Sequence, residues 1–88
     1  MIMSNNGLRL SEEQAWILRR VIEAAVQLLT NEEDIKKCVS LFEKWEAGAL
    51  YLSLKKIRYN GHVYKCILPH TSSGSKTPEN KTYWQLVV

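Results

Sequence analysis

Imidazoles and thiols are the side chains best suited to acid–base or nucleophilic chemistry, and the sequence has few of them. Its 88 residues contain two histidines, His62 and His70, and two cysteines, Cys38 and Cys66. They show no metal-ligand spacing, and the sequence has no phosphate-binding glycine loop or nucleophile elbow. We expect both histidines to bond to backbone or pack, and both cysteines to be buried thiols, with one disulfide as the alternative. The sequence predicts a protein that is not an enzyme and has no metal or cofactor.

Aromatic side chains are the remaining candidates for a binding site. Six of them fall within about forty residues: Trp45, Tyr51, Tyr59, Tyr64, Tyr83 and Trp84. Some must fill the core of a small domain, because few other large side chains are available. Any that stay exposed would be flat, rigid surfaces suited to stacking on sugar rings, on bases or on a protein partner. Spacing alone leaves these three ligand classes open.

A β-hairpin positions most of these aromatics. Asn60-Gly61 is the pair that best adopts the two positive φ angles of a type I′ turn. Counting outward predicts three facing pairs: Tyr59 with His62, Ile57 with Tyr64, and Lys55 with Cys66. One face is expected to be buried and carries Ile57, Tyr59, His62, Tyr64 and Cys66. The other is expected to be solvated and carries Lys56, Arg58, Val63 and Lys65. Residues 83–87 alternate again and predict a third strand.

Residues 11–44 are expected to form an antiparallel helical hairpin. The capping box Ser11-Glu12-Glu13-Gln14 starts the first helix. Apolar residues then recur at helical spacing and predict a buried stripe: Leu18, Val21, Ile22, Ala25, Leu28 and Leu29. A second helix follows residues 30–34 and is expected to reach Lys44. The predicted fold is therefore α+β: a flexible leader (1–10), a helical hairpin (11–44) and a small three-stranded antiparallel β module (45–88).

The net charge and the N-terminal sequence indicate which classes of partner and which compartment to expect. The net charge is +3, and residues 46–88 hold six basic residues against two glutamates. This balance is too mild to argue for nucleic acid, which leaves single-stranded nucleic acid as a third alternative only. No run has transmembrane length, and the N-terminus lacks the features of a signal peptide. We expect no membrane association, synthesis in a host cytoplasm, and release, if any, as part of a virion.

Several short motifs occur in a fixed order across residues 45–87. They are Trp45-x5-Tyr51, Ile57-x-Tyr59-Asn60-Gly61-x-x-Tyr64-Lys65-Cys66, His70-Thr71-Ser72, Pro78 and Trp84. In this order they resemble the carbohydrate-binding modules of families 5 and 12, the chitin-binding type 3 fold. The helical prefix leading into Leu41-Phe42-x-x-Trp45 resembles small proteins encoded among bacteriophage tail genes, in which a helical hairpin precedes such a module.

The resemblance implies a core that takes Tyr64 and Trp84, and a sugar-binding strip formed by Trp45 and Tyr51. The sequence departs from the family at two places. Leu54-Lys55 stands where the family usually has Gly-Asp, which changes the bend before the hairpin. Lys76 stands where a second exposed Trp is usual, and losing one of two stacking surfaces should weaken binding about ten-fold.

The expected function is that of a non-catalytic phage-type binding protein, which stacks on cell-surface glycan and is attached to a tail or baseplate through its helical hairpin. The alternative is a protein-interaction module, either a structural tail component or a phage-encoded inhibitor of a host protein. Its basic residues would meet an acidic partner: Lys55, Lys56, Arg58, Lys65, Lys76 and Lys81. Trp16, on the polar helix face, is either a rim residue or a contact with another subunit, and the hairpin is a candidate for homo-oligomerisation.

Overall fold

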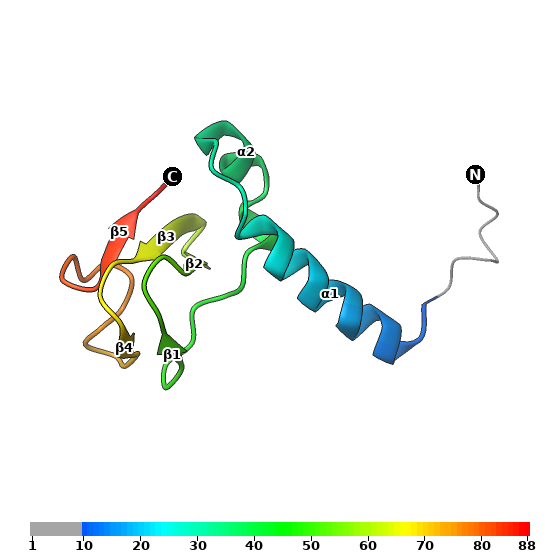
Figure 1. Ribbon diagram of the computed structural model, residues 1–88. Coiled ribbons are helices and arrows are strands. Elements are labelled where there is room, and N and C mark those ends of the chain that lie inside the picture. Colours follow the sequence, from blue (N-terminus) through cyan, green and yellow to red (C-terminus); the bar gives the residue numbers. More distant parts are fainter. Residues whose placement is uncertain (1–9) are drawn as a thin grey trace.

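The computed structural model describes residues 10–88 (Figure 1). Its helical elements are α1 (Glu12–Val26), α2 (Glu32–Lys37) and the 3₁₀ helix η2 (Val39–Leu41). Its strands are β1 (Leu50–Tyr51), β2 (Lys56–Tyr59), β3 (His62–Cys66), β4 (His70–Thr71) and β5 (Trp84–Leu86). The α+β class is confirmed. Residues 1–9 of the predicted leader lie outside the described residues.

The hairpin of β2 and β3 follows the sequence prediction. Asn60 and Gly61 have φ angles of 51° and 78°, as a type I′ turn requires. The register pairs Tyr59 with His62 and Ile57 with Tyr64. Strand β5 pairs with β3 and completes the expected three-stranded antiparallel sheet in the order β2-β3-β5. A second sheet of β1 and β4 was not predicted.

Both faces of the three-stranded sheet are covered, so the predicted solvated face is wrong at its centre. On the expected inner face Ile57 and Cys66 are buried with Tyr51 and Trp84. On the opposite face Val63 is also fully buried, in a cluster with Val26, Ile35 and Phe42. The cause is α2 and the segment after it, which pack over β3 and bring apolar side chains onto Val63.

The outer edge of β2 is covered by two other parts of the chain. The Gln27 amide bonds both backbone groups of Lys56, accepting from its N–H (2.9 Å) and donating to its carbonyl (2.7 Å). Arg58 then pairs in parallel with residues 43–45: its N–H donates to the Glu43 carbonyl (2.9 Å), and its carbonyl accepts from Trp45 (3.0 Å). The second helix ends at Lys37 and η2 follows it, so the predicted helix to Lys44 is wrong, and Lys44 lies instead in an extended segment that pairs with Arg58.

Helix α1 begins as predicted but does not pack as predicted. The Ser11 side chain and Gln14 form the capping box. Figure 1 shows α1 extending away from α2 and from both sheets. Leu18 and Val21 are exposed and Leu28 is 81% exposed, so the predicted buried stripe is wrong over most of its length, while Leu29 at its end packs on the core. Residues 11–44 are not seen as a packed helical hairpin. None of the helices within residues 10–88 is both long and apolar enough to cross a membrane.

Leu54 forms a β-bulge before β2. Its N–H donates to the Cys66 carbonyl (2.8 Å), while the Cys66 N–H donates to the Lys55 carbonyl (2.8 Å), so two residues face one. The first position of such a bulge is left-handed and usually glycine, and Leu54 has a φ of 76°. Leu54 therefore adopts, in the bend before β2, a left-handed conformation that costs a non-glycine residue backbone strain.

We expect Leu54→Gly to raise the free energy of unfolding by about 0.5 to 1 kcal/mol, because glycine relieves the left-handed strain at some cost in unfolded-state entropy. Little burial is lost, since the Leu54 side chain is 68% exposed. Urea unfolding measures the change. The matched control is Leu52→Gly, at another exposed leucine whose φ is not positive, and it should be neutral or destabilising. A less stable Leu54→Gly protein would contradict the account.

Candidate functional site

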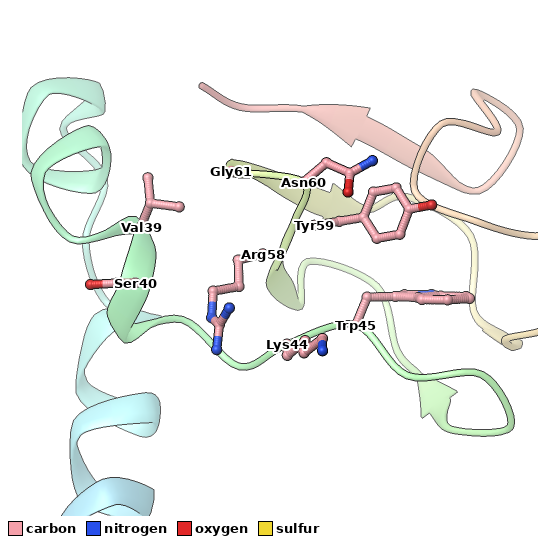
Figure 2. A pocket seen from close by; sticks show the side chains of 8 residues that line it. All are labelled: Val39, Ser40, Lys44, Trp45, Arg58, Tyr59, Asn60 and Gly61. Atoms are coloured by element: carbon pink, nitrogen blue, oxygen red, sulfur yellow. The ribbon is translucent and has the colours of Figure 1, made fainter.

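A groove of about 520 Å³ opens between η2 and the tip of the β2–β3 hairpin (Figure 2). It is lined by Val39, Ser40, Lys44, Trp45, Arg58, Tyr59, Asn60 and Gly61. This volume is within the range of small-ligand sites. The groove contains Trp45, which the family resemblance predicts as a sugar-binding residue.

Backbone pairing along the edge of β2 places Trp45 beside Tyr59. The parallel pairing of residues 43–45 with Arg58 fixes the Trp45 backbone one residue from Tyr59. The two rings meet edge to face, with centroids 5.5 Å apart and planes at 81°. Both side chains are half-buried, and the row of rings continues from Tyr59 to Tyr64 (6.3 Å) and on to His62 (6.4 Å). The groove therefore has an aromatic wall, in which Trp45 and Tyr59 are kept in place by packing against neighbouring rings.

Polar groups complete the groove. The Arg58 Nε donates to the Phe42 carbonyl (2.8 Å), which holds the guanidinium in place, and Lys44 is exposed. Ser40 supplies a hydroxyl and Asn60 an amide. The Trp45 Nε1 is buried and has no hydrogen-bond partner among the described residues. Aromatic rings beside amide and hydroxyl groups can stack on a sugar ring and bond its hydroxyls.

Tyr51 is not part of this groove, which corrects the second predicted ligand residue. Its side chain is only 4% exposed and packs on Trp84 with centroids 5.1 Å apart. The Tyr51 hydroxyl accepts a hydrogen bond from the Glu46 N–H (2.9 Å), and burial raises the pKa of that hydroxyl above its ordinary value. The β1–β4 pairing turns Tyr51 inward, so it has no free ring face. Sequence analysis missed Tyr59 in this role, although its place beside the turn was visible.

Most predicted partner-binding residues have bonding partners within the chain. Lys55 pairs with Glu43 (3.4 Å), and the Lys56 Nζ donates to the Gln27 carbonyl (3.3 Å). Lys76 lies over the Tyr83 ring, with Nζ 5.4 Å from the centroid. The half-buried Lys65 faces Lys56 across the hairpin.

Lys81 and Trp16 lie outside the groove. Lys81 is exposed and lines a hollow beside β5. Trp16 is 69% exposed and lines a shallow hollow of its own on α1.

One thiol and one imidazole lie side by side, with the Cys66 Sγ 3.8 Å from the His70 Nδ1. Cys38 and Cys66 are free, Cys66 is fully buried, and burial raises the pKa of its thiol. The His70 Nδ1 bonds the Leu68 carbonyl (2.7 Å) as expected, while His62 is exposed with Nδ1 3.2 Å from the Val88 carbonyl. Within residues 10–88 no cluster of three or more metal-ligating side chains occurs.

The part of the chain that holds the aromatic wall is similar to a known family. Residues 44–85 match the model of carbohydrate-binding module family 5/12. This 5/12-like module runs from Lys44 to Gln85 and includes Trp45 and Tyr59. The chain is also 36% identical over 63 residues to chitinase A1 of Niallia circulans, a match that covers 70% of this chain and 9% of that enzyme. No solved structure matches the chain.

Proposed function

We propose that this protein is a non-catalytic glycan-binding protein whose groove holds a sugar ring against Trp45 and Tyr59. The observation that carries the proposal is this pair of half-exposed rings, held 5.5 Å apart in a groove that also presents an amide and a hydroxyl. Stacking of sugar C–H faces on aromatic rings needs such rigid surfaces. The family match over residues 44–85 supports the same class of ligand.

Insoluble β-linked glycan is the first ligand class to test, because the similar enzyme is named a chitinase. Lys76 lies over Tyr83 at the position where a second stacking Trp is usual in the family. Glycan binding should therefore be weaker than in a site with two exposed Trp rings. The experiment measures retention of the purified chain on chitin, cellulose and bacterial cell-wall material. Retention on neutral chitin that persists at high salt supports stacking. No retention on any matrix would overturn the proposal.

A protein-interaction role has a different surface in its favour. The basic β face is a poor candidate, because Lys56 and Arg58 bond the carbonyls of Gln27 and Phe42. Helix α1, in contrast, leaves open an apolar seam of three residues at three- and four-residue spacing, Leu18, Val21 and Ala25, and the exposed Leu28 follows in the turn after the helix. A 15-residue helix with an uncovered apolar face is marginal alone, and a heptad-spaced seam is self-complementary between two copies. A second copy is therefore the occupant we propose for it. Attachment to a phage tail, or inhibition of a host protein, stays a prediction.

Charged substitutions in this seam should lower the mass of the particle in solution. Val21→Glu places a carboxylate in the centre of the seam, and the sedimentation mass is expected to fall to that of one chain. Arg20→Glu, on the adjacent exposed position outside the seam, is the control and should leave the mass unchanged. A wild-type protein that sediments as a single chain at all concentrations would contradict this role.

A further inference from the structure

We infer that the groove prefers an acidic glycan, one whose sugars carry a carboxylate, over a neutral one. This inference rests on the proposed function, because it names the ligand class of the same groove. Both charged side chains that line the groove, Lys44 and Arg58, are cations. Neither of them forms an ion pair within residues 10–88, so their charges are not neutralised by the protein.

The two cations are placed where a sugar substituent would meet them. In Figure 2 the Arg58 and Lys44 side chains lie in the part of the groove between Ser40 and the Trp45 backbone, and the Trp45 and Tyr59 rings extend from there away from Ser40. The carbonyl of Phe42 holds the Arg58 Nε (2.8 Å), so the guanidinium is already oriented before a ligand arrives. A preoriented guanidinium loses less conformational entropy on binding a carboxylate than a free side chain does.

Two carboxylates, Glu43 and Glu46, share a second hollow with Lys44, but neither of them lines the groove. Glu43 is adjacent to Lys44 in sequence but bonds Lys55 (3.4 Å) outside the groove. A ring stacked on Trp45 would therefore find cations, an amide and a hydroxyl, and no carboxylate among the lining side chains. That set suits a sugar with an acidic substituent, while a neutral sugar would use only part of it.

The experiment compares two tetrasaccharides with the same β-1,4 linkage. One is neutral and built of N-acetylglucosamine. The other alternates N-acetylglucosamine with N-acetylmuramic acid, whose lactyl carboxylates are left free, and a third sample has these carboxylates converted to amides. Titration of the full chain is expected to show about 2- to 5-fold tighter binding of the acidic form per cation engaged. The amide form should match the neutral one, and salt should reduce only the acidic preference.

Lys44→Gln is the test variant, since Lys44 is exposed and its loss should not affect folding. It should lower the affinity for the acidic tetrasaccharide about 2- to 5-fold more than the affinity for the neutral one. Lys81→Gln makes the same change in net charge at an exposed position outside the groove and should alter neither. A sugar that carries a phosphate in place of the carboxylate tests whether the groove binds either anion. Binding of this sugar that is weakened in Lys44→Gln supports an anion site at Lys44.

The outcomes separate this inference from the proposed function. Equal binding of the neutral and acidic forms, lost in Trp45→Ala and unchanged in Lys44→Gln, overturns the inference and leaves the proposed function standing. Binding of neither form overturns the proposed function itself. If Trp45→Ala binds the acidic tetrasaccharide as tightly as the wild type does, the acidic sugar binds outside the groove, and the inference is overturned.

Discussion

Replacing Trp84 with alanine is expected to lower the free energy of unfolding by about 3 to 5 kcal/mol. The Trp84 side chain is 1% exposed and packs against Tyr51 (5.1 Å) and His70 (5.3 Å). Its Nε1 donates to the Lys76 carbonyl (3.2 Å), which connects the core to the segment between β4 and β5. Alanine leaves a large cavity and an unpaired buried carbonyl in a domain with little other core.

Denaturant unfolding followed by circular dichroism measures this effect. Trp16→Ala is the matched control, because Trp16 is largely exposed on α1, and it should change the stability by less than about 0.5 kcal/mol. If Trp84→Ala does not fold at all, Trp84→Phe keeps most of the packing, and its smaller loss can be measured. A loss below about 1 kcal/mol for Trp84→Ala would show that Trp84 does not organise the core.

Replacing Trp45 with alanine is expected to weaken glycan binding about 10- to 100-fold, which corresponds to about 1.4 to 2.8 kcal/mol. The ring supplies the main stacking surface of the groove, and Tyr59 alone offers a smaller one. Tyr59→Ala should therefore weaken binding less than Trp45→Ala. Retention on chitin and titration with soluble oligosaccharide measure both variants.

Trp16→Ala controls for the general loss of an exposed Trp and should bind like the wild type. Circular dichroism must first show that Trp45→Ala is folded, since the Trp45 ring also packs against the core around Trp84. Binding that is unchanged in a folded Trp45→Ala protein, or lost equally in Trp16→Ala, would contradict the assignment of the groove.

Local sequence chemistry predicted the hairpin. Asn60-Gly61 favours one turn type, and that turn fixes the register of Ile57 and Tyr59 without help from the rest of the chain. The burial of Cys66 followed from the same counting. Trp45 was singled out by a resemblance, and the structure places it in a groove.

Long-range backbone pairing produced what the sequence did not predict. Residues 43–45 bond Arg58 through main-chain groups, which nearly every residue type possesses. The side-chain pattern therefore did not predict this pairing, nor that the second helix would end at Lys37. The same pairing puts Tyr59 in the groove, while the unpredicted β1–β4 sheet buries Tyr51. An amphipathic stripe shows that α1 has an apolar face but does not show what covers it.

The most direct test of the glycan-binding groove observes the three Trp indole N–H signals by NMR while chito-oligosaccharide is added. Each signal reports one site: Trp45 in the groove, Trp84 in the core and Trp16 on α1. The account predicts that the Trp45 signal shifts in a saturable way while those of Trp16 and Trp84 stay in place. Saturable binding that shifts the Trp16 signal and leaves Trp45 unchanged would contradict it.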